Sequence, residues 1–464
     1  MGQVRADRRS SRSGPSRVSS SRGPRPGPVD EGKDQVKTRR SGIGRSLRRL
    51  EWIGAGAALF VFSGAIFPLM VSGADGMLDP SERGRLRLLN LLAYAVILGL
   101  LALRPVAFIR ALTRNLPMLA LVALTFASTF WSISQSVTMR RAIGLLLSMA
   151  LAYLLATRFT PRQQIQLIGT VLGVATGLSL LAAGAMPGKA FLPGESELRG
   201  VFIHKNVLGW IASFCVLIGI VAQSDASRRM RVGGRVLIVT GLAATLASGS
   251  ATGLLSVVTA FVTVATVRTL ARKRGAARLF AKMVILLASI AALSALIIGL
   301  IPLLEFLGKD ATLTGRVPLW ELVVPEIERR PVLGHGYGAF WSEASPAAWR
   351  IWEAEGWQAP HAHEGYLDLL LGIGVVGLAL FAVVAWLAIA RGVHLCSVAP
   401  DEGWAWCVAA VVGALVMNLS ESTILMQNDI LWVLFSTAAL TISMRHAELV
   451  QPLPRHVRLA HAAV

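Results

Sequence analysis

Three short segments combine arginine or histidine with other polar residues, and each lies next to a long apolar run. They are Arg199–Asn206, Thr312–Trp320 and His361–Leu367. Arginine binds anionic oxygens through two parallel hydrogen bonds and stays protonated. Histidine, with an ordinary pKa of about 6.5, can act as a base near neutral pH. Because ionisable groups at membrane depth are costly, we treat these segments as the candidates for chemistry.

The pair His361 and His363, with Glu364 next to it, has a spacing that could share a zinc ion on an extended segment. The other candidate ligands, His204 and His335, have no spacing that demands coordination. We therefore expect no metal and no other cofactor. If the segment continues as a helix, one face carries His363, Tyr366, Leu367, Leu370, Gly374 and Gly377.

Two glycine clusters resemble phosphate-binding loops but fit other roles better. The segment Gly372–Gly377 matches GxGxxG, yet it lies inside an apolar run instead of following a strand. Its small residues favour close helix contact. The segment Gly334–Gly338 follows Pro331 and lacks the lysine of a phosphate loop, so we expect a turn there.

The elements that position these segments are predicted from composition. The chain has 464 residues, of which 54% are hydrophobic and 16% charged, with a mean hydropathy of +0.59. Soluble domains have about 25% charged residues, so a soluble enzyme is excluded. The 3 Cys lack CxxC spacing, which excludes a disulfide framework and a thiolate metal site.

The apolar residues form runs of about 20, the length that a bilayer core of about 30 Å requires of a helix. We predict an all-α polytopic membrane protein with about 12 transmembrane helices. The predicted spans are 52–72, 86–103, 115–133, 142–157, 165–186, 206–223, 236–248, 251–267, 283–304, 364–390, 404–418 and 429–444.

Half of the net charge of +20 lies in residues 1–50, which hold 12 Arg and 2 Lys against 4 acidic residues. We predict that this segment is a disordered cytoplasmic tail and not a nucleic-acid-binding region. Most remaining Lys and Arg residues fall in loops on the same side. Both termini are therefore predicted to be cytoplasmic, with spans in 51–304 and 364–445 and a C-terminal tail at 446–464.

A long loop at 305–363, between the ninth and tenth predicted spans, holds five of the 12 Trp. Long loops in compact proteins are usually functional or disordered, and this one is too aromatic for disorder. We expect it to fold over the outer, periplasmic surface of the membrane. Its tryptophans suit either contact with sugar rings or anchoring at the interface.

At these residues the chain resembles the bacterial O-antigen ligase and polymerase superfamily, and most of all its exopolysaccharide-polymerisation membrane proteins. The motifs cover most of residues 125 to 380 in the superfamily's order. They are Trp131–Arg141, Arg199–Gly209, Ser248–Leu255, Thr314–Trp320, Pro331–Phe340 and His363–Leu367, followed by Gly372 and Gly377.

The resemblance implies a metal-independent membrane glycosyltransferase that uses a glycan on a polyprenyl (undecaprenyl) diphosphate. Arg199 and Arg316 would bind the diphosphate, and His363 would be the catalytic base. Candidate supporting residues are His361, Glu364, Tyr366, Asn206, Trp320 and Glu421. Glu364 stands where the superfamily usually has Asn, and the turn at Ser250–Thr252 lacks an Arg often found there.

The resemblance implies that repeat units of an exopolysaccharide or O-antigen are polymerised at the outer face of the bacterial inner membrane. The expected partners are a polyprenyl-diphosphate oligosaccharide, a saccharide acceptor, the lipid bilayer and a chain-length regulator, without nucleic acid. Three alternatives stay open: a ligase that transfers glycan to lipid A core or protein, a transporter or flippase, and a non-catalytic scaffold.

Overall fold

The computed structural model describes residues 31–65, 80–191, 194, 196–275, 277, 283 and 316–450. Within these residues the secondary structure is helical apart from one isolated β-bridge, between Phe191 and Leu198. In this described part of the chain, eight helices are long and apolar enough to cross a membrane, and a ninth span results if one bent pair is counted as a span. The predicted all-α polytopic membrane fold is confirmed.

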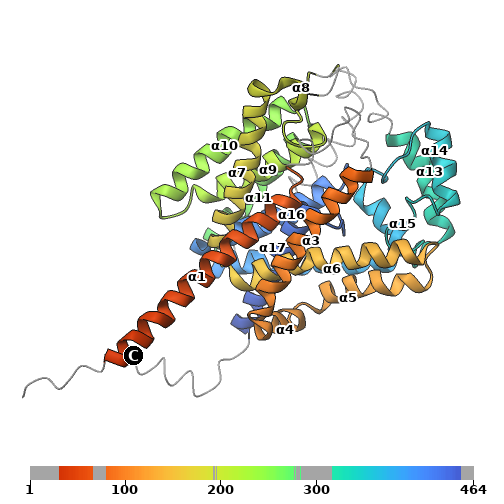
Figure 1. Cartoon of the computed structure of the whole chain (residues 1–464). Coiled ribbons are helices and arrows are strands. Elements are labelled where there is room, and N and C mark those ends of the chain that lie inside the picture. The colour runs from red at the N-terminus through yellow and green to blue at the C-terminus, as the bar shows by residue number, and fades with distance from the viewer. Residues whose placement is uncertain are drawn as a thin grey trace, which may run out of the picture. The chain divides into compact units, whose positions relative to one another are not determined.

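Figure 1 shows the helices of the described residues, and eleven of the 12 predicted spans overlap one of them. Because eight or nine of these helices are able to cross a membrane, the count of 12 stays a prediction. The bent pair, α4 and α5, turns by 91°. The ninth predicted span, 283–304, lies outside the described residues apart from residue 283. The bounds are α1 (Glu31–Phe62), α3 (Pro80–Ala102), α4 (Pro105–Thr113), α5 (Leu116–Ala127), α6 (Gln135–Arg158), α7 (Pro161–Ala185), α8 (Pro187–Ala190), α9 (Lys205–Ala222), α10 (Arg228–Ala247), α11 (Ala251–Arg272), α13 (Arg316–Arg329), α14 (Pro346–Glu355), α15 (Gly365–Val398), α16 (Trp404–Met417) and α17 (Ile430–Val450).

Helix α1 begins at Glu31, inside the basic segment for which the sequence predicts disorder. Residues 31–50 are rich in Arg and also contain Lys, and both are good helix formers that need no apolar core for a helix to start. The earlier residues of the predicted tail lie outside the described part. The chain divides into two units, a smaller and a larger one, with the boundary between Leu50 and Glu51 of α1.

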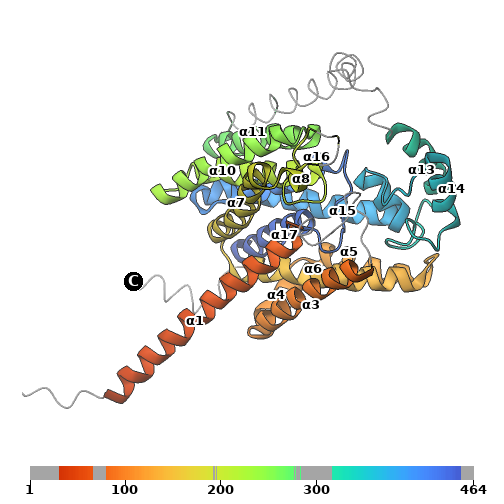
Figure 2. The same cartoon turned by 45° about the horizontal axis from the view of Figure 1, so that its top comes forward.

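Within the larger unit, α9 packs against α7, α10, α11 and α16, and most of its length is buried. Both α10 and α11 pack against α9, and Figure 2 shows α10 and α11 next to each other. On α10, Val232, Val236, Val239 and Leu246 recur at helical spacing and are all exposed. Such an apolar stripe on an outward helix face fits contact with lipid acyl chains.

Helix α15 is broken at Ile373 and Gly374, whose φ is +63°. The predicted continuous face from His363 to Gly377 is therefore wrong. At the break, the glycine-rich segment docks onto the helix: His335 N donates to Leu371 O at 2.7 Å, and Gly336 N donates to Gly372 O at 3.0 Å. In return, Val375 N donates to Pro331 O at 2.9 Å.

The glycine-rich segment forms turns, as predicted, since Gly334, Gly336 and Gly338 all have positive φ. A side chain at Gly334 would meet the backbone of Gly372 at 2.6 Å, so these two segments touch backbone to backbone. The small residues of Gly372–Gly377 do allow a close approach, but to this turn and not to another helix.

The described part of the aromatic loop folds around its own core. Leu319 and Val323 of α13 pack with Ile351 and Trp352 of α14, and Leu371 of α15 joins this cluster. Figure 1 shows α13 and α14 together at one end of α15. The tryptophans divide between two roles, because Trp341 and Trp352 are buried while Trp349 and Trp357 remain more than 40% exposed.

Replacing Gly374 with Ala should destabilise the protein by at least about 2 kcal/mol. A Cβ there would lie 2.2 Å from Val332 O, and φ is positive. Thermal unfolding of the detergent-solubilised protein measures the effect. The matched control is Gly413→Ala on α16, where a Cβ meets no atom within 4 Å. An equal melting temperature for Gly374→Ala and Gly413→Ala would contradict this account of the break.

Candidate functional site

His363 lies immediately before α15 in an unusual backbone conformation, with φ at +53°. For a residue with a side chain this region is sparsely populated, although His enters it more often than most. The preceding residue is held by α13, because Trp320 Nε1 donates to Ala362 O at 2.8 Å. Such strain persists only where neighbouring contacts enforce it, and it is frequent at functional sites.

The imidazole of His363 is packed against aromatic rings. Its centroid lies 4.2 Å from that of His361 and 5.9 Å from that of Trp357. Its Nδ1 atom is buried and has no hydrogen-bond partner within the described residues. Burial, helped by the nearby charges of His361, Arg316 and His204, lowers the pKa of His363 to about 3. The ring is therefore neutral at pH 7.

Arg316, at the start of α13, meets the loop between α16 and α17. Its Nη2 lies 3.1 Å from Glu421 Oε1, and its Nη1 donates to Ser420 O. Asn206 Nδ2, from the start of α9, donates to the same Glu421 oxygen at 3.4 Å. Burial raises the pKa of Glu421 to about 7 despite the charge of Arg316. Three segments distant in sequence therefore converge here.

Arg199 is only 8% exposed, and its Nε donates to Lys189 O at 3.0 Å. Its connection with the other candidates runs through the segment 199–206. His204 in that segment acts electrostatically on His363, and Asn206 reaches Glu421. Arg316, Glu421 and Asn206 are thus joined by hydrogen bonds, and His361 and His363 by ring contact. The charge of Arg316 acts on His363 through space, and Arg199 is linked to both groups through its neighbours.

Two of the predicted supporting residues form hydrogen bonds that stabilise the start of α15. Glu364 is the N-cap of α15, where its carboxylate accepts the Leu367 N–H. Burial raises the pKa of Glu364 to about 7. Tyr366 donates its hydroxyl to Leu415 O of α16 at 2.7 Å. Both side chains fix the start of α15 beside His363.

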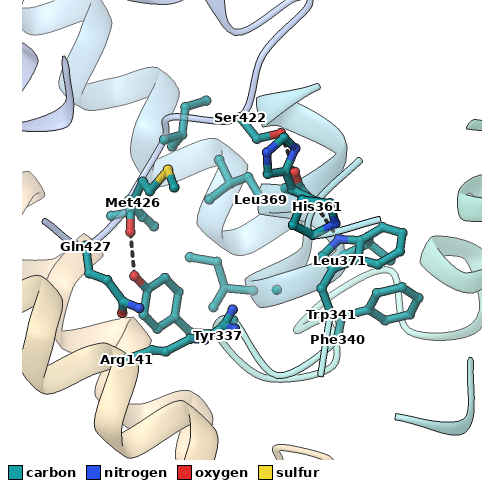
Figure 3. Close-up of a pocket in the computed structure, with 17 residues that line it drawn as sticks. Arg141, Tyr337, Phe340, Trp341, His361, Leu369, Leu371, Ser422, Met426 and Gln427 are labelled. Atoms are coloured by element: carbon teal, nitrogen blue, oxygen red, sulfur yellow. Dashed lines mark hydrogen bonds between the residues drawn. The ribbon is translucent and has the colours of Figure 1, made fainter. Parts of the chain in front are cut away.

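A cavity of about 300 Å³ lies beside His361 (Figure 3). Apart from His361, its polar residues were not among the sequence candidates. Asp368 is one of them, and its carboxylate accepts hydrogen bonds from Trp341 Nε1 at 2.7 Å and from the Ala362 N–H. An acidic residue inside a long apolar run is the signal that could have identified it. The other polar lining residues are Arg141, Tyr337, Ser422 and Gln427.

The histidines do not gather as metal ligands. His335 Nε2 lies 2.8 Å from Glu326 O, and His204 Nδ1 accepts the Asn206 N–H at 3.2 Å. Within the described ranges no three His, Cys, Asp or Glu side chains form a group that could hold a metal ion. The close pair His361 and His363 instead contact each other edge to face.

Comparisons with known proteins point to one family. A family model described as O-antigen ligase matches residues 236–382. The chain is 28% identical over 270 residues to the exopolysaccharide production protein ExoQ of Rhizobium meliloti (strain 1021), an alignment that covers 55% of this chain and 60% of that relative. The predicted resemblance to the O-antigen ligase and polymerase superfamily is confirmed. The superfamily segment contains Arg316, His361 and His363, whereas Arg199, Asn206 and Glu421 lie outside it.

Glu364 is the N-cap of α15. Asn, which the superfamily resemblance leads us to expect at this position, is a preferred N-cap residue and would fill the same role. Glu364→Ala should lower the free energy of unfolding by about 1 kcal/mol. Glu364→Asn should retain stability. The measurement is thermal unfolding, with Glu353→Ala on the exposed face of α14 as control. A stable Glu364→Ala variant would show that the carboxylate does not cap α15.

Proposed function

We propose that this protein transfers a glycan from a polyprenyl-diphosphate carrier to a sugar hydroxyl, and so polymerises an exopolysaccharide or O-antigen at the periplasmic face of the inner membrane. The observation that carries the proposal is the neutral His363, with a buried and unpartnered Nδ1, close to the cation Arg316. Both residues lie in the matched superfamily segment. Its relative ExoQ is named for exopolysaccharide production.

Arg316 is suited to the donor diphosphate. A guanidinium has five N–H donors, and the contacts to Ser420 and Glu421 engage two of its nitrogens. Because the pKa of Glu421 is near 7, its carboxylate can take up a proton when an anionic substrate approaches. Arg316 would then exchange one anionic partner for another. Arg199 is proposed as the second diphosphate ligand, as the superfamily resemblance implies.

His363 is proposed as the base. Its pKa is low because the ring is buried and, to a smaller extent, because Arg316 is near, and a bound diphosphate would raise it by supplying negative charge. The imidazole would then accept the proton of the attacking sugar hydroxyl. The hydroxyl oxygen forms a bond to the anomeric carbon as the bond from that carbon to the diphosphate oxygen breaks. The diphosphate leaves with the electron pair, and the anomeric centre is inverted.

Arginine can stabilise the charge that develops on the leaving group, the task for which many soluble glycosyltransferases use a divalent cation. Since Arg316 and Arg199 stay protonated at any working pH, we propose that transfer needs no metal ion. The second candidate function is a ligase that moves finished glycan to lipid A core or protein. The family model's own description, O-antigen ligase, favours it.

His363→Ala should reduce transfer at least 100-fold, because general-base catalysis contributes 10²–10⁴-fold. The assay is mass analysis of products from the reconstituted protein and a defined polyprenyl-diphosphate oligosaccharide. His394→Ala is the matched control, since His394 lies near the other end of α15. Wild-type product yield from a membrane-inserted His363→Ala variant would refute the proposed base.

A deletion strain separates the two candidate functions. If the protein is a polymerase, the strain should still make single repeat units but lose chain length. If long polymer instead accumulates on its carrier, the protein is a ligase. Complementation by the wild-type chain and by His363→Ala, with carrier-linked glycans sized by gel and mass spectrometry, completes the test.

A further inference from the structure

The cavity beside His361 belongs to a different part of the protein from the Arg316 contact. Its walls come from α6, the glycine-rich turn, the first turns of α15 and the loop before α17. His361 lines it, whereas His363 and Arg316 do not. Because the His361 and His363 rings are 4.2 Å apart, the cavity adjoins the proposed base on the side of His361.

Arg141 of α6 is the notable polar group in this cavity. Its Cδ lies against Gly338, where a side chain would come within 2.5 Å of it. Across the described residues, its guanidinium forms no hydrogen bond and no ion pair. Asp368 attracts it only through space, since that carboxylate already accepts from Trp341, Ala362 and Ser422. A half-buried cation without a hydrogen-bonded or ion-paired partner favours the binding of an anionic ligand.

The rest of the cavity is suited to a sugar. Tyr337, Phe340 and Trp341 supply aromatic surface. Gln427 lines it too, and its Oε1 is buried with no hydrogen-bond partner in the described part of the chain. Figure 3 shows Arg141, Tyr337 and Gln427 at one end of the cavity and His361 with Ser422 at the other. Apolar walls with a few polar groups are typical of ligand sites, and about 300 Å³ is the lower end of their size range.

We propose that this cavity binds the terminal sugar of the acceptor and that Arg141 recognises an acidic substituent, such as a uronic acid carboxylate, on it. The inference rests on the proposed function and specifies its acceptor. In a sugar bound here, the carboxylate would lie at the Arg141 end of the cavity. Its reacting hydroxyl would lie toward His361 and, beyond it, the proposed base His363.

The test is a binding measurement on the full-length protein in nanodiscs, which needs no turnover. The two probes are methyl β-D-glucuronide and methyl β-D-glucoside, which differ in one carboxylate, and saturation-transfer NMR gives both dissociation constants. The wild-type protein should bind the glucuronide about tenfold more tightly, as expected for a charge-assisted hydrogen bond to arginine. No preference in the wild type would overturn the proposal without any variant.

Arg141→Gln should abolish the preference. Its matched control is the neighbouring Arg140→Gln, because Arg140 is exposed and donates only to Ser136 O of its own helix. Arg141→Lys, which keeps the charge but not the planar fork, should retain part of the preference. A preference that survives Arg141→Gln, or that disappears equally in Arg140→Gln, would contradict the assignment to Arg141.

Carrier diphosphate is the other anion that Arg141 could meet, and inorganic diphosphate is the probe for it. If the cavity holds the acceptor, diphosphate should leave glucuronide binding unchanged, and Arg316→Gln should weaken diphosphate but not glucuronide. Competition between the two probes, with diphosphate weakened by Arg141→Gln, would assign the cavity to the carrier and overturn the proposal. A glucuronide preference in a protein inactive in transfer would instead count against the proposed function alone.

Discussion

The break in α15 is the constraint on which the rest of the site depends. A broken helix inside a membrane protein leaves carbonyl and N–H groups that lipid cannot satisfy. Here the segment from Pro331 to Gly336 supplies the missing partners, with donors to Leu371 and Gly372 and an acceptor for Val375. The exchange ties the folded loop to the helix that begins just after His363. The histidine, the turn and α13 are thus held as one assembly.

The electrostatics of the site depend on this packing. Burial keeps the His363 ring neutral, and the charge of Arg316 acts in the same direction. The acids near it, Glu421 and Glu364, have pKa values raised to about 7 and can be neutralised at little cost. A site that combines the cation Arg316 with readily protonated acids is suited to an anionic ligand. It is much less suited to a neutral ligand.

Much of this was predictable from sequence. The all-α membrane fold follows from apolar runs of about 20 residues, and the convergence of Arg316, Asn206 and Glu421 fits their common position at the ends of spans. The break at Gly374 was not predictable, because GxGxxG within an apolar run reads equally well as close helix packing. Its partner, Pro331–Gly338, lies some forty residues earlier, and backbone pairing over that separation leaves no local pattern.

Both halves of the site contain residues of the segment that matches the O-antigen ligase family. Arg316 and His363 lie within it, as do Tyr337, His361 and Asp368 of the adjoining cavity. The cavity residues Arg141, Ser422 and Gln427 lie outside it. In the proposed reaction, holding a carrier diphosphate and removing a proton are needed whatever sugar accepts the glycan. The shape and charge of the cavity would need to match only that sugar. Because His361 borders both halves, substitutions in α6 or the loop before α17 can change acceptor choice while the groups that activate the donor keep their contacts.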